Sequence, residues 1–182
     1  NGQNNLGSVK YNNEKTLEQI DLLPSANLVY SFMEEMNIRA SYNRTLARPS
    51  FKEKSIAQIF DPVSRLTFLG NIDLEETHIN NFDLRWEYFF TSDEMFSLSG
   101  FYKTFDGHIE FVALDTDRNS IKPRNSGNST VYGAEIEFRK NLGFITPSLS
   151  NLAIGSNISL VKSYVDLKSV IVDNNGGNEY DL

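Results

Sequence analysis

The sequence of 182 residues contains no cysteine, so neither disulfides nor thiolate metal sites contribute to it. No apolar run approaches the roughly 18–20 residues that a membrane-spanning helix needs. The formal net charge is −7, and no basic patch is available to neutralise phosphates, which argues against nucleic acid as a partner. No Gly-x-Ser-x-Gly elbow or other catalytic constellation is visible, so we expect neither an enzyme nor a cofactor.

The start of the chain also lacks a recognisable signal peptide. No basic segment followed by an apolar segment comes after Asn1, so no signal peptide is recognisable. We therefore expect either that a leader was removed or that the sequence begins inside a larger protein.

What the sequence does contain is alternation of apolar and polar residues. The clearest case runs from Phe82 to Phe90, where Asp83, Arg85 and Glu87 separate aromatic and aliphatic residues. A period of two suits a strand with two unlike faces and does not suit a helix. Similar patterns predict six strands, at about 24–33, 37–46, 79–90, 95–111, 129–140 and 152–167.

The connections between these strands alternate in length. Segments 34–36 and 91–94 are short, whereas 47–78 and 112–128 are long, and the third turn, 141–151, contains Pro147. All five prolines lie at strand ends or outside strands, as expected for a residue that cannot donate to a sheet ladder. The pattern predicts an all-β fold, an antiparallel up-and-down meander of the kind found in outer-membrane barrels.

Alternation alone leaves two interpretations open. The first is a barrel wall that faces lipid; the second is a soluble antiparallel sheet, a surface module that binds protein or glycan. Aromatic residues near the strand ends, charge in mid-strand and strands longer than the usual five or six residues all favour the barrel.

The barrel interpretation assigns the two faces of the strands to two media. The lumen-facing candidates are Arg39, Asp83, Arg85, Glu87, Glu135, Glu137 and Arg139. The lipid-facing candidates are Tyr30, Tyr42, Phe82, Leu84, Trp86, Tyr88, Phe90, Ile136 and Phe138.

Four segments resemble one family. Asn43–Phe51 resembles the arginine-proline signature of TonB-dependent receptors, especially those of Bacteroidetes-type bacteria. Leu69–Glu76 is similar to that family's Gly-Asn-Pro-Asp-Leu segment, with Ile72 in place of the usual proline. Phe101–Glu110 is similar to its Phe-Tyr-Lys strand, and Val131–Phe138 resembles its Gly-x-Glu-x-Glu strand. The four segments occur in the right order and cover about residues 22–165.

The resemblance implies a piece from the C-terminal half of a 22-stranded barrel in the outer membrane of a Gram-negative bacterium. It divides the chain into a tail at 1–20, a partial barrel at 21–168 and a loop at 169–182. The expected partners are outer-membrane lipid and, through the full-length parent, a plug domain and TonB. The imported nutrient would be a ferric chelate, a vitamin or an oligosaccharide. An isolated fragment is expected to self-associate through its open strand edges.

Residues outside the strands suggest anchoring rather than chemistry. Pro49 stops the ladder where a strand enters a long loop, and Arg48 is the candidate that anchors this loop. A metal site at His78 with Glu75 or Glu76 has loose spacing. A calcium loop at Asp106, Asp115 and Asp117 lacks its central glycine. We therefore expect solvated loops at both places and no metal site.

Overall fold

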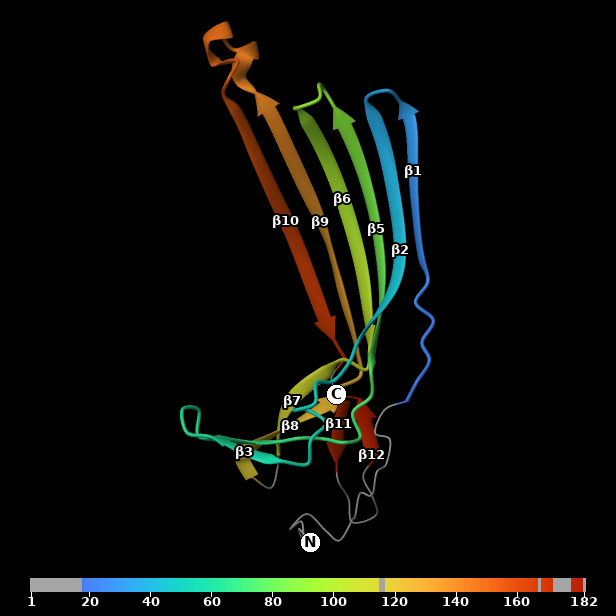
Figure 1. Ribbon diagram of the computed structural model, residues 1–182, viewed down its shortest axis with the longest axis vertical. Helices are drawn as coiled ribbons and strands as arrows, with labels where there is room; N and C mark the ends of the chain where they lie inside the picture. Colours follow the sequence, from blue (N-terminus) through green and yellow to red (C-terminus); the bar gives the residue numbers. More distant parts are fainter. Residues whose placement is uncertain (1–17, 115–116, 167, 172–177, 182) are drawn as a thin grey trace.

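The computed structural model describes residues 18–114, 117–166, 168–171 and 178–181. Six antiparallel strands form its main sheet, in the order β1-β2-β5-β6-β9-β10 (Figure 1). These strands are β1 (Ser25–Met33), β2 (Met36–Ala47), β5 (Thr77–Phe89), β6 (Met95–Asp106), β9 (Asn128–Asn141) and β10 (Ala153–Val165). The predicted all-β meander is confirmed, because each main strand overlaps one of the six predicted ranges.

The two long connections carry strands of their own. β3 (Gln58–Asp61), β4 (Leu66–Leu69), β7 (Ile109–Leu114) and β8 (Asp117–Asn125) form a second sheet in the order β3-β4-β8-β7. It lies beyond the end of the main sheet, opposite the short turns (Figure 1). β4 pairs in parallel with β8, Thr67 opposite Ser120. This sheet was not predicted, since its pairing joins two loops that are distant in sequence.

The predicted loop at 169–182 also contains strands. β11 (Lys168–Ile171) pairs antiparallel with β12 (Asn178–Asp181) in the described part of that segment. Four-residue strands are too short to display a reliable period, so the Asn-Gly composition of the segment dominated the prediction.

The predicted strand 95–111 is divided at Gly107. Gly107 and Gly127 have φ of 68° and 86°, a left-handed region that residues with a Cβ atom rarely adopt. The amide of Gly107 donates to the carbonyl of Gly127 at 3.0 Å, so the two bends lie opposite each other in one hairpin. The hairpin β6–β9 therefore bends here and continues as β7 and β8 into the second sheet.

The register of the main sheet keeps like residues on one face. Ile38, Trp86, Leu98 and Ile136 are paired in one row across β2, β5, β6 and β9. The next row on the opposite face contains Arg39, Arg85, Ser99 and Glu135. A slip of one residue would exchange the faces of a strand, so the hydrophobic pattern fixes this register.

Burial in the main sheet is the inverse of that in a soluble sheet. On the apolar face, Leu84 is 59% exposed, whereas Glu87 and Ser97 on the polar face are 6% and 1% exposed. Among the described residues, the buried aliphatic and aromatic side chains are Phe68 and Leu74, in the loop between β2 and β5, and Pro123 in β8. The described part of the chain contains no helix long and apolar enough to cross a membrane. The small hydrophobic core therefore supports the loops and leaves both faces of the main sheet uncovered.

A glycine on the polar face makes room for an aromatic ring. Phe101 of β6 is paired with Gly133 of β9. A Cβ atom on Gly133 would lie 2.7 Å from Cζ of Phe101, and closer still to the carbonyl oxygen of Leu160 in β10. Because the carbonyl of Leu160 belongs to the backbone of a paired strand, it cannot move away easily, so glycine at 133 leaves room for both this carbonyl and the ring of Phe101.

We predict that Gly133→Ala destabilises the main sheet by about 1–3 kcal/mol, the usual effect of overpacking. Gly155→Ala in β10 is the matched control, because its Cβ atom would meet its nearest neighbour, the carbonyl oxygen of Phe138, at an ordinary 3.7 Å. The measurement is the temperature at which the folded, fast-migrating form of the full-length protein converts to the unfolded form on a gel. Equal transition temperatures for the two variants would contradict this account of Gly133.

Candidate functional site: the polar face and the loop anchor

Arginine and glutamate side chains alternate across the polar face of the main sheet. Nε of Arg39 (β2) lies 2.7 Å from Oε2 of Glu87 (β5), and Nε of Arg85 lies 2.9 Å from Oε1 of Glu87. Arg85 reaches across β6, where Nη1 donates to Oγ of Ser99 at 3.3 Å. Its Nη2 lies 2.8 Å from Oε2 of Glu137 in β9.

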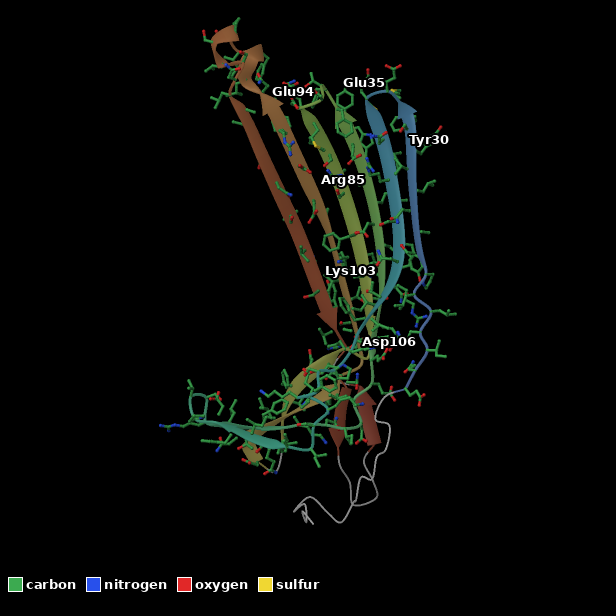
Figure 2. The ribbon with its side chains drawn as sticks, in the orientation of Figure 1. Tyr30, Glu35, Arg85, Glu94, Lys103 and Asp106 are labelled. Atoms are coloured by element: carbon green, nitrogen blue, oxygen red, sulfur yellow. The ribbon has the colours of Figure 1, made fainter. Side chains whose placement is uncertain are left out.

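The chain of charges ends at Arg139, whose Nη2 lies 3.6 Å from Oε1 of Glu137. Five side chains of alternating sign thus connect β2, β5 and β9. Figure 2 shows Arg85 in mid-strand, far from Glu35 and Glu94 at the turns and from Asp106 at the other end. The carboxylates accept charge-assisted hydrogen bonds, which offset the cost of partial burial. We call these five residues the charge ladder: Arg39, Arg85, Glu87, Glu137 and Arg139.

Two further carboxylates of the polar face have hydroxyl partners. Oγ of Ser41 donates to Asp83 at 3.1 Å, and Oγ of Ser159 donates to Glu135 at 3.2 Å. Within the described residues, neither carboxylate lies in an ion pair. All seven lumen-facing candidates therefore share one face, but Asp83 and Glu135 do not join the charge ladder. The serines were not predicted, because a serine in an alternating strand carries no signal of its partner.

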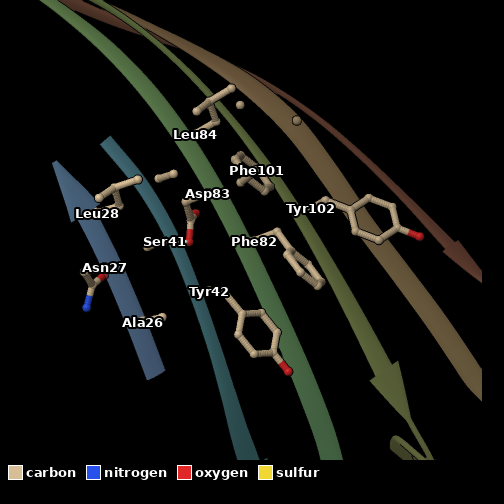
Figure 3. A pocket seen from close by; sticks show the side chains of 13 residues that line it. Ala26, Asn27, Leu28, Ser41, Tyr42, Phe82, Asp83, Leu84, Phe101 and Tyr102 are labelled. Atoms are coloured by element: carbon tan, nitrogen blue, oxygen red, sulfur yellow. Dashed lines mark hydrogen bonds between the residues drawn. The ribbon is translucent and has the colours of Figure 1, made fainter. Parts of the chain in front are cut away.

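A hollow of ≈ 680 Å³ opens between two rows of the apolar face of the main sheet (Figure 3). One row contains Tyr42, Phe82 and Tyr102, and the next contains Leu28, Ala40, Leu84 and Gly100. Ala40 and Gly100 are small, so they leave space among the larger side chains. The lining is mostly apolar, and nothing in it supports a catalytic arrangement.

The opposite face carries all nine lipid-facing candidates. Toward the long loops, the rings of Tyr42 and Phe82 are 4.8 Å apart, and those of Tyr132 and Tyr164 are 5.9 Å apart. Toward the short turns, the rings of Tyr88 and Phe90 are 4.7 Å apart. Two aromatic bands thus flank a zone of aliphatic and small residues. The span from Phe82 in β5 to Phe90, one residue past its end, is nine residues, within the 9–11 that a membrane strand needs.

The two family-like segments of the first long loop meet in space. Nε of Arg48 lies 3.0 Å from Oε1 of Glu76, and its Nη2 lies 3.9 Å from Oδ2 of Asp21. Nζ of Lys54 donates to the carbonyl of Leu74 at 2.6 Å. Pro49 follows the end of β2 at Ala47. These contacts bring the start and the end of the loop together where β2 ends and β5 begins.

The groups weighed as metal ligands have other partners. Nε2 of His78 lies 3.8 Å from Oδ1 of Asp21. Asp117 accepts a hydrogen bond from Oγ of Ser120, which lowers the pKa of its carboxyl. Asp115 lies outside the described residues. Within the part of the chain that is described, no three histidine or acidic side chains form a group that could hold a metal ion.

Comparison with solved structures shows where this fold occurs. The siderophore receptor PirA from Pseudomonas aeruginosa is similar over 80% of this chain and 29% of its own, with 17% identity and a TM-score of 0.67. The ferric enterobactin receptor PfeA, from the same organism, is similar over 77% of this chain and 22% of its own, with 17% identity and a TM-score of 0.61. The chain thus spans less than a third of these receptors. At this identity the likeness concerns the fold.

No curated protein sequence matches the chain. A family model described as "TonB dependent receptor-like, beta-barrel" matches residues 3–181. That range includes every strand of the main sheet and both long loops. The chain therefore belongs to the TonB-dependent receptor-like β-barrel family.

Proposed function

We propose that the chain forms six strands in the wall of a 22-stranded TonB-dependent receptor in the outer membrane of a Gram-negative bacterium. The inverted burial carries this proposal. Leu84 and its apolar neighbours have no protein layer over them, and in water such a large exposed apolar area would cause association. Hydrocarbon removes this penalty, while the charged face turns to the lumen and the plug.

The open edges of the sheet support the same proposal. β1 and β10 each pair on one side only, so a row of their backbone groups has no partner in the main sheet. In lipid those groups have no water to bond with, and a closed barrel is the arrangement that satisfies them. In the full-length receptor further strands would pair with both edges, whereas an isolated fragment would self-associate through them.

We propose import of a small nutrient as the function of the whole receptor. The names of the similar structures, a siderophore receptor and a ferric enterobactin receptor, favour a ferric chelate over a vitamin or an oligosaccharide. The plug would occupy the lumen against the charge ladder, and TonB would supply energy through the parent. Arg48 and Pro49 would hold the first long loop at the mouth of the barrel. This function makes the chain a transport component with no enzyme activity.

Disrupting the gene of the full-length receptor tests transport directly. We expect growth to fail when one ferric chelate is the sole iron source and to recover when the intact gene is restored. Loss of growth on a vitamin or an oligosaccharide instead would keep the transport proposal and change its substrate. Normal uptake of all three classes would contradict it.

Adjacent positions on β2 test which medium each face meets. Ala40 lies on the apolar face and Ser41 on the polar face. We predict that Ala40→Arg destabilises the folded receptor by about 2–4 kcal/mol, the cost of placing Arg against lipid near the midplane. Ser41→Arg places the same side chain beside Asp83 and should be tolerated. The readout is the fraction of receptor that folds in vesicles over a urea series; greater damage from Ser41→Arg would reverse the assignment of the faces.

The charge ladder makes a prediction of its own. Glu87→Gln removes the carboxylate that bridges Arg39 and Arg85, and we expect a loss of about 1–3 kcal/mol, typical of a partly buried group that loses its charged partner. Glu135→Gln is the control, because among the described residues that carboxylate has only the Ser159 hydroxyl as its partner. The same urea series measures both variants. Equal losses would show that the ladder adds nothing beyond individual hydrogen bonds.

A further inference from the structure

The turn between β9 and β10 differs from the other short turns of the main sheet. It contains the one-turn helices η1 (Leu142–Phe144) and η2 (Pro147–Leu149). The segment 141–152 has no charged residue. By contrast, Glu34 and Glu35 form the β1–β2 turn, and 91–94 includes Asp93 and Glu94. A turn that is exposed to water would normally contain charged residues, as the other two turns do.

The turn is nevertheless well ordered by its own hydrogen bonds. The amides of Ile145 and Leu149 each donate at 3.0 Å to the carbonyl three residues earlier. Asn141 accepts from the amide of Gly143 at 2.6 Å, and its Nδ2 donates to the carbonyl of Ser150. Backbone groups satisfied within the segment need little water, which is what the boundary of a bilayer requires.

Apolar side chains project from this ordered turn. Phe144 is 70% exposed and Ile145 is 62% exposed. Leu152 and Ile154, also exposed, continue the apolar surface onto β10, where Ile154 is paired with Lys140. Lys140 has the same strand parity as Ile136 and Phe138. The exposed apolar surface of the main sheet thus extends past the strand ends onto the turn.

A lysine, Lys140, lies at the border between this apolar surface and water. Nζ of Lys140 lies 2.6 Å from Oε2 of Glu94, 4.5 Å from the ring centre of Phe90 and 6.0 Å from that of Phe144. The hydrogen bond from Lys140 holds the pKa of Glu94 below its ordinary value, so this carboxylate stays ionised near neutral pH. A charge above aromatic rings at the rim of an apolar band is the arrangement of groups at a headgroup boundary.

We propose that the η1–η2 turn is a membrane-interface anchor, with Phe144 and Ile145 inserted among phospholipids of the leaflet at the short-turn end. This inference rests on the proposed wall function, because it extends the lipid-facing surface of that wall. The occupant is lipid rather than protein, since the apolar surface is continuous with the lipid-facing band and no charge on the turn offers a specific contact. The anchor would fix the depth of β9 and β10 in the bilayer.

Site-directed spin labelling of the full-length receptor in phosphatidylethanolamine–phosphatidylglycerol vesicles tests the anchor. This chain has no cysteine, so Ile145→Cys and Phe144→Cys provide unique label sites within it. Ser92→Cys, in the polar turn at the same end, is the water control, and Leu84→Cys in mid-strand is the lipid control. The measured quantity is collision with oxygen against collision with a water-soluble nickel chelate.

We expect labels at 144 and 145 to collide preferentially with oxygen, at a depth of about 5–10 Å, shallower than the label at 84. The label at 92 should collide preferentially with the nickel chelate. If 84 lies in lipid but 144 and 145 behave like 92, the anchor is refuted and the wall stands. If the labels at 144 and 145 collide with neither oxygen nor the nickel chelate, a protein covers the turn and the anchor is again refuted. A water-exposed label at 84 would refute the wall itself.

Discussion

A sheet one layer thick must satisfy its backbone hydrogen bonds within the sheet and find a suitable medium for each of its faces. In the main sheet the strands pair along almost their whole length, so the first requirement is met everywhere except at β1 and β10. The second requirement cannot be met in water, because the apolar face is uncovered. Both requirements are met together when the sheet is part of a closed barrel in lipid.

The polar face shows what holds such a sheet when no hydrophobic core is available. A soluble sandwich gains most of its stability by burying one face of each sheet against the other. Here the side chains that bury one another are charged and hydroxylic, and the charge ladder spans β2, β5 and β9. A pair such as Arg85 and Glu137 links strands that are not direct neighbours. The ladder thus ties strands together across the polar face.

Much of the main sheet could be predicted from sequence, because its information is local. Alternation in Phe82–Phe90 depends only on side chains two residues apart, and it placed the strand and both of its faces. The division at Gly107 was missed, since a glycine in an alternating run does not reveal its φ. The sheet of β3, β4, β7 and β8 was missed for a different reason: the pairing of Thr67 with Ser120 is decided by two loops folding together.

In the candidate site, too, local features were predicted and contacts between distant residues were not. The alternating pattern placed all seven lumen-facing candidates on one face, but it did not distinguish Glu87, which bridges two arginines, from Glu135, which accepts a hydrogen bond from Ser159. That difference depends on register across several strands, and one sequence does not encode register visibly. The contact of Arg48 with Glu76 is of the same kind, because the two residues are 28 positions apart in the sequence.

The loops and the wall depend on opposite physical principles within one chain. Phe68 and Leu74 of the first long loop and Pro123 of the second are buried, as in a soluble domain. Arg48 and Lys54 tie the first loop to itself by polar contacts. A few residues further, β5 begins and the burial pattern inverts. Because Gly107 and Gly127 bend the second hairpin at the same level, both long loops leave the wall together and pair as one layer. The boundary between lipid and water is therefore set by the ends of the strands. At the same residues, the chain passes from strands that expose apolar side chains to loops that bury them.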